Sequence, residues 1–169
     1  GECEFAKVCD AQHQCASMHK WSKGFGSTSW GDYPRSVAMA SGGDILIAGA
    51  FSNPMDLGGG TLTPKGNSDG FVARYDANGN HLWSKSLGLG NTDFLYAMAS
   101  DPVSDESVVT GYYYLYTDWG MGQLNAIGSY DGVAAKLDKV GNAVWTKSFG
   151  ASSGWTYPMA VALRGSGDV

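Results

Sequence analysis

The phrase Trp83-Ser-Lys-Ser-Leu-Gly88 decides the fold, because the chain carries versions of it on both sides at one fixed distance. Trp21-Ser-Lys-Gly-Phe-Gly26 lies 62 residues before it, and Trp145-Thr-Lys-Ser-Phe-Gly150 lies 62 residues after it. A period of this length indicates an architecture of repeated supersecondary units, since each unit buries its apolar face against the next one.

The same offset relates many positions between the three phrases. Glycines and aspartates dominate the matches: Gly49 and Gly111, Asp56 and Asp118, Asp69-Gly70 and Asp131-Gly132, Asp76 and Asp138, Gly79 and Gly141. A shift of one residue then aligns Asp32-Tyr33-Pro34 with Asp93-Phe94-Leu95 and Thr156-Tyr157-Pro158. One register therefore holds over most of the chain.

Each period predicts four short strands, because runs of apolar and β-branched residues alternate with clusters of Gly, Asn and Asp. The predicted strands are 36–40, 45–51, 71–75 and 81–87 in the first period, and 96–100, 107–113, 133–137 and 143–149 in the second. Two more are expected at 19–25, which echoes the fourth strand, and at 159–163, which echoes the first. The turns 76–79 and 138–141 are predicted hairpins in which glycine supplies a positive φ.

Four antiparallel strands at a fixed spacing are typical of a β-propeller blade. The first strand of each period carries small residues such as Ala38, Ala97 and Ala160, which suit the narrow inner end of a blade. The sequence therefore predicts an all-β fold of four-stranded antiparallel blades, an incomplete propeller of about two and a half blades. Its parts are an outer strand at 19–26, blades at 27–88 and 89–150, and the start of a further blade at 151–169. A β-solenoid and a tandem β-sandwich are the alternatives, although a single sandwich domain would occupy most of this length.

The repeat resembles the bacterial SBBP repeat, a family whose name abbreviates seven-bladed β-propeller. The resemblance covers residues 19–169 and lies in the tryptophan phrase, in Gly58-Gly59-Gly60 and in Asp69-Gly-Phe-Val-Ala-Arg-Tyr-Asp76. In the second repeat Trp119-Gly-Met-Gly122 departs from the triple glycine. The family is common in secreted and surface proteins of myxobacteria and related bacteria. The resemblance therefore implies a propeller fold and a secreted or cell-surface location, but no substrate.

All three cysteines, Cys3, Cys9 and Cys15, lie in the N-terminal segment 1–18. A cysteine cluster at one end of an otherwise cysteine-free chain indicates a disulfide-stapled segment in an oxidising compartment. Because three is an odd number, one thiol stays free or pairs outside this stretch. The alternative is a metal site formed with His13, but the spacing matches no zinc motif of the C-x2-C type. We therefore expect a disulfide and neither a metal nor a cofactor.

Charge and composition narrow the classes of partner. The formal net charge of −5 and the pI of about 4.9 argue against binding to nucleic acid. No apolar run approaches the roughly 18 residues that a membrane-spanning helix requires. The expected partners are another protein, a glycan or further copies of the chain.

Candidate catalytic groups are sparse. None of His13, His19 and His81 accompanies a nucleophile motif such as G-x-S-x-G. Eight of the aspartates recur as four pairs between the two repeats, and a residue repeated in every unit is expected to hold turns or bind backbone amides. The sequence therefore predicts a protein that is not an enzyme, with no catalytic residues.

Aromatic residues provide the better case for binding. Strand directions alternate, so the long links of all units lie at one end of the sheets. Five rings map to that end and are the predicted ligand-binding residues: Trp30, Tyr33, Trp119, Trp155 and Tyr157. Rings on loops held by a rigid scaffold are suited to recognising sugars or proteins. The alternative interpretation is that they fill gaps between blades.

These observations favour an exported, non-enzymatic module for binding or for structural assembly at the cell surface. The alternative is a lectin or a carbohydrate-active enzyme unit that is completed by missing blades or by oligomerisation.

Overall fold

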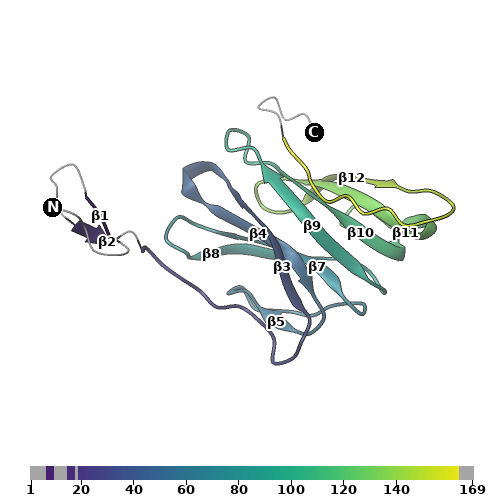
Figure 1. Cartoon of the computed structure of the whole chain (residues 1–169), viewed down its shortest axis with the longest axis horizontal. Helices are drawn as coiled ribbons and strands as arrows, with labels where there is room; N and C mark the ends of the chain where they lie inside the picture. The colour runs from purple at the N-terminus through teal and green to yellow at the C-terminus, as the bar shows by residue number, and fades with distance from the viewer. Residues whose placement is uncertain (1–6, 10–14, 18, 164–169) are drawn as a thin grey trace.

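A computed structural model describes residues 7–9, 15–17 and 19–163, and its regular structure is all-β apart from one short 3-10 turn (Figure 1). One four-stranded antiparallel sheet contains β3 (Asp32–Met39), β4 (Ile45–Phe51), β7 (Asp69–Tyr75) and β8 (His81–Leu87). A second contains β9 (Asp93–Ser100), β10 (Ser107–Thr117), β11 (Leu124–Leu137) and β12 (Ala143–Phe149). Neither sheet closes on itself within the described residues, and we refer to them as the first and second sheets.

Smaller elements complete the described chain. The 3-10 turn η1 (Ser41–Gly43) joins β3 to β4, and the hairpin of β5 (Met55–Asp56) and β6 (Thr61–Leu62) lies between β4 and β7. Near the N-terminus, β1 (Lys7–Cys9) pairs with β2 (Cys15–Ser17), and Cys9 lies opposite Cys15 in the backbone register. Figure 1 shows this hairpin apart from the two stacked sheets.

The main core lies between the two sheets. Leu46, Ala48, Val72 and Leu87 come from the first sheet, and Leu95, Val109, Tyr113 and Val133 come from the second. All eight are buried, and burying one such Leu or Val side chain contributes about 1.5–3 kcal/mol. The packing of the two sheets is therefore driven by apolar burial.

A second apolar cluster lies on the other side of the first sheet. Phe71, Ala73 and Tyr75 alternate along β7 with Val72, which faces the main core, so they point to the opposite face. Met55 and Leu57 from the β5–β6 region pack against them. The Tyr75 hydroxyl donates to the carbonyl oxygen of Leu57 at 2.6 Å, which fixes the hairpin to the sheet.

In each sheet, the hairpin turn before the last strand accepts a hydrogen bond from a tryptophan of the preceding unit. Trp21 Nε1 donates to the Ala77 carbonyl at 3.2 Å, and Trp83 Nε1 donates to the Lys139 carbonyl at 2.9 Å. Both acceptors lie 56 residues after the donor. In both turns a glycine with φ of 81° leaves room for the indole.

Most predicted strands are present. β4, β8 and β12 have the predicted bounds, and the expected all-β antiparallel arrangement is confirmed. Both predicted hairpin turns are also confirmed, since Gly79 and Gly141 have positive φ and donate to the carbonyls of Asp76 and Asp138.

Two predicted strands were wrong. Residues 19–25 and 159–163 have no regular secondary structure. A strand requires a neighbour for its N–H and C=O groups, and no strand of the described chain is paired with either segment. The predicted disulfide stays a prediction, because Cys3 lies outside the described residues and the backbone pairing of Cys9 with Cys15 does not test whether their thiols are joined. His13, of the alternative metal site, also lies outside the described residues.

Candidate binding surface

The repeated aspartates act as acceptors for backbone amides. Asp56 Oδ1 accepts from the N–H groups of Gly58 and Gly60, and Asp118 Oδ1 accepts from those of Gly120 and Gly122. Both pairs of distances are 2.7 and 3.1 Å. A carboxylate that holds two amides fixes a tight loop, as the sequence predicted.

The other repeated aspartates follow the same rule. Their backbone donors are two residues each for Asp69 (Lys65, Gly66), Asp131 (Ile127, Gly128), Asp76 (Asn78, Asn80) and Asp138 (Val140, Asn142). Asp32 and Asp93 each accept from one backbone amide, of Ser27 and Leu89. All eight therefore serve local structure, which confirms the prediction that they hold turns and bind amides.

Eight rings form a continuous group that we call the aromatic cluster: Tyr33, Phe94, Tyr96, Tyr112, Tyr114, Tyr130, Trp155 and Tyr157. Tyr112 lies at its centre. Its ring is stacked on Phe94 at 5.7 Å with an interplanar angle of 3°, and it meets Tyr157 edge to face at 4.8 Å. Such geometries are the favourable ones for aromatic pairs.

The register of the second sheet brings these rings together. Tyr112 of β10 pairs directly with Phe94 of β9, and Tyr114 of β10 pairs with Tyr130 of β11. Successive side chains of β10 point to opposite faces, so Tyr113 is buried in the main core while Tyr112 points to the other face. Burial therefore alternates along this part of β10, with Tyr113 buried and Tyr112 and Tyr114 half-buried.

The segment after β12 brings the last two rings to this face. Trp155 forms an isolated parallel bridge with Tyr130, and the Thr156 N–H donates to the Tyr130 carbonyl at 3.1 Å. The rings of Trp155 and Tyr157 are 6.1 and 6.3 Å from the ring of Tyr130. Figure 1 shows this segment running along the second sheet.

Arg35 adds a positive charge to the aromatic cluster. Its guanidinium carbon lies 5.7 Å from the ring centroids of Tyr33 and Tyr96 and 5.8 Å from that of Phe94. These distances are within the range of cation–π attraction. The ion pairs of the described residues involve Arg74 and Lys136, so Arg35 has no acidic partner among them.

Exposure separates the five predicted ligand-binding residues. Trp155 is 70% exposed, Tyr33 43% and Tyr157 39%, and all three belong to the aromatic cluster. Trp119 is fully buried in the main core, where its Nε1 donates to Asp93 Oδ1 at 3.3 Å. Its ring is therefore not available at the surface, contrary to the prediction.

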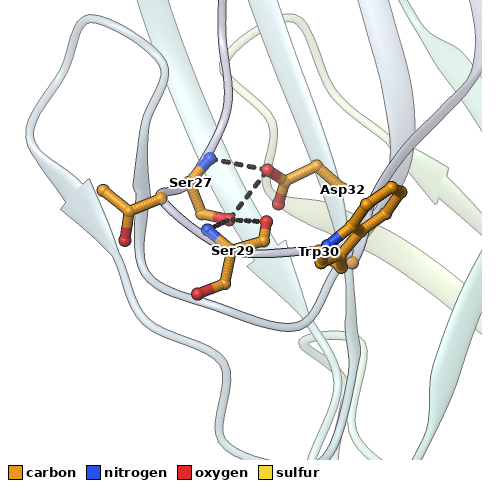
Figure 2. Close-up of a pocket in the computed structure, with 6 residues that line it drawn as sticks. Ser27, Ser29, Trp30 and Asp32 are labelled. Atoms are coloured by element: carbon orange, nitrogen blue, oxygen red, sulfur yellow. Dashed lines mark hydrogen bonds between the residues drawn. The ribbon is translucent and has the colours of Figure 1, made fainter.

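Trp30 lies on a separate loop and is 98% exposed. The loop lines an open hollow of about 310 Å³ together with Ser27, Ser29 and Asp32. Asp32 Oδ2 accepts from the N–H and the hydroxyl of Ser27 at 2.6 and 2.9 Å, as Figure 2 shows. Trp30 makes none of the ring contacts of the aromatic cluster, and its indole lies apart from the bonded serines (Figure 2).

Burial changes the acidity of two groups near this end of the sheets. Desolvation, together with the neighbouring tyrosines, raises the pKa of Tyr112 to about 12, so its hydroxyl stays protonated. Burial also raises the pKa of Asp93 to about 7, against the donated hydrogen bonds that favour its charged form. The described residues contain no group of three or more His, Cys, Asp and Glu side chains placed to hold a metal ion.

Comparison of the chain with models of known protein families and with curated protein sequences finds no match. The resemblance to the SBBP repeat therefore rests on the residues quoted for it. No helix in the described part of the chain is long and apolar enough to cross a membrane.

Proposed function

We propose that the chain is an exported, non-enzymatic bacterial β-propeller module of the SBBP type that binds a glycan or a protein through the aromatic cluster. The observation that carries the binding proposal is the continuity of the cluster from β3 to the segment after β12, with exposed rings at both ends.

The propeller part of the proposal is supported by the way the sheets repeat. Both are four-stranded antiparallel meanders, and the first strand of one packs beside the first strand of the next. The outward face of the first sheet also exposes apolar side chains, with Val37 and Met39 each 67% exposed. Monomeric proteins rarely leave such a surface uncovered, so we propose that further sheets of the same kind cover it.

The binding part of the proposal is supported by the exposure of three rings of the aromatic cluster. If they only filled a gap in the core, all of them would be buried, as Trp119 is. Instead Tyr33, Trp155 and Tyr157 keep a third or more of their surface exposed while their neighbours hold them in place. Rigid, exposed aromatic side chains offer contact area at a low cost in conformational entropy.

Binding is favoured over catalysis by the roles of the carboxylates. Each of the eight repeated aspartates is engaged by at least one backbone amide, and such a carboxylate is tied to its loop. A glycosidase requires two carboxyl groups facing a substrate. We therefore propose recognition as the activity of this surface.

The test is binding to a glycan array and to immobilised candidate proteins, with variants that remove exposed rings. Trp155→Ala and Tyr157→Ala should each lower the affinity of the best ligand about tenfold or more, the loss of one interfacial hot spot. Val103→Ala is the control, because Val103 is 87% exposed in the link between β9 and β10 at the other end of the sheets. Unchanged affinity in both ring variants would contradict the proposal.

A further inference from the structure

We propose that the ligand of the aromatic cluster is an acidic polysaccharide whose sugar rings carry carboxylates, and that Arg35 binds one of those carboxylates. This inference rests on the proposed binding function and adds the chemical class of the ligand. It assigns Arg35, which the sequence did not single out, as the residue that determines specificity.

The position of Arg35 is the first argument. The guanidinium lies at nearly equal distances of 5.7 to 5.8 Å from three rings, and these contacts restrict a side chain that would otherwise be mobile. Cation–π contacts engage the flat face of the group and leave the N–H donors at its edge available. Arg35 is exposed, and no hydrogen bond joins its guanidinium to a described residue, so those donors are open to solvent.

The chemistry of the missing partner is the second argument. A guanidinium presents parallel N–H donors that match the two oxygens of a carboxylate. The residues of the aromatic cluster carry no acidic side chain, whereas Arg74, which is buried, already has Asp44 and Asp105 as partners at 2.9 and 3.1 Å. Arg35 is therefore a cation for which the ligand supplies the anion.

The arrangement of the rings indicates a sugar polymer. The C–H bonds on one face of a pyranose carry partial positive charge and pack on the negative face of an aromatic ring. Tyr33, Phe94, Tyr112 and Tyr157 follow one another in steps of 5.4, 5.7 and 4.8 Å, so exposed rings at the two ends can contact different sugar units. In a hexuronate the carboxylate projects from the edge of the ring, so stacking and ion pairing can occur together.

The experiment measures binding of the full chain by calorimetry to an oligogalacturonate and to its methyl ester. The ester keeps the sugar faces and removes the negative charge. We expect the acid to bind about tenfold more tightly than the ester, in line with one charge-assisted contact. The advantage of the acid should also decrease as the salt concentration rises, because an exposed ion pair is screened.

Variants assign this advantage to Arg35. Arg35→Gln should make the affinities for acid and ester equal without weakening the binding of the ester, and Arg35→Lys should keep only part of the advantage, since it lacks the planar fork. Lys23→Gln is the matched control, because Lys23 also lies over a tyrosine ring, that of Tyr75 at 5.3 Å, but outside the cluster. Near-ultraviolet circular dichroism establishes that each variant is folded.

The outcomes separate this inference from the proposed function. Equal binding of acid and ester, unchanged by Arg35→Gln, would overturn the acidic ligand and leave glycan binding in place. Binding to an immobilised protein, with no binding to either oligosaccharide, would overturn the inference and leave the proposal of protein binding in place. If the chain bound neither a glycan of the array nor an immobilised protein, both the inference and the proposed function would be overturned.

Discussion

The indole Nε1 of Trp83 donates a hydrogen bond to the carbonyl oxygen of Lys139, which belongs to a turn of the second sheet. Trp83 lies on the last strand of the first sheet, so the contact joins the two sheets at their outer edge. Trp21 makes the same contact with Ala77. The residue that marks the sequence repeat is therefore also the residue that connects one unit to the next.

Replacement of this tryptophan tests the connection. Trp83→Phe removes the donor and keeps an aromatic ring, and we expect a loss of about 1 kcal/mol in the free energy of unfolding. Trp145→Phe is the matched control, because the described residues provide no acceptor for the Trp145 indole. Urea denaturation measures both, and equal losses in the two variants would contradict the role given to the Trp83 bond.

The turn that receives the indole has its own requirement. Gly141 has a φ of 81°, and a Cβ built on it would lie 2.8 Å from the Trp83 ring. Gly122→Ala provides the control, because Gly122 also has a positive φ, 96°, but nothing lies within 4 Å of its Cβ position. Backbone strain should cost both variants about 1–2 kcal/mol. Gly141→Ala should lose about 1–3 kcal/mol more from overpacking, measured by urea denaturation, and equal losses would show that the ring contact is unimportant.

Arg74 makes a second connection between the sheets. It is 5% exposed, pairs with Asp44 and Asp105, and donates to the Lys139 carbonyl at 3.2 Å. Arg74→Met leaves Asp44 and Asp105 without their cation and should destabilise the fold by about 3 kcal/mol. Lys136→Met breaks the more exposed pair with Glu106 and should cost less than about 1 kcal/mol. Thermal unfolding followed by circular dichroism ranks the two, and the reverse order would contradict this view of the network.

The buried carboxyl of Asp93 predicts how stability changes with pH. Asp69 and Tyr113 are the titratable groups that influence it, and a Cβ on Gly88 would lie 2.8 Å from both Asp69 Cγ and Asp93 Oδ2. Because burial raises the pKa of Asp93 from 3.8 to about 7, its contribution to stability is fully present below pH 4 and is lost as the pH rises toward 7. The loss is at most about 4 kcal/mol.

Asp93→Asn removes this titration. The wild-type protein should lose stability toward urea between pH 4 and pH 7, and the variant should lose less over the same range. Asp76→Asn is the control, because hydrogen bonds with Asn80 lower the pKa of the exposed Asp76, which therefore titrates only below this range. Parallel pH profiles for the wild type and Asp93→Asn would contradict the assignment.

The period and the turn glycines made the strands predictable, because both are local features of the sequence. The segments at 19–25 and 159–163 resemble strands in composition, but a strand exists only beside a partner, and that is not a local property. The burial of Trp119 could have been found, since it matches Leu57 one period earlier, and Leu57 is 1% exposed. The roles of Arg35 and the central Tyr112 in the aromatic cluster could not be predicted, because the contacts that bring them together depend on how β3 packs beside β9.

Nuclear magnetic resonance of the chain with a bound oligosaccharide tests the central claim most directly. If the aromatic cluster is the binding surface, nuclear Overhauser contacts will connect sugar protons with the rings of Tyr33, Trp155 or Tyr157, and resonance shifts will be concentrated on β9, β10 and the segment after β12. Contacts confined to the Trp30 loop or to the opposite end of the sheets would contradict the account.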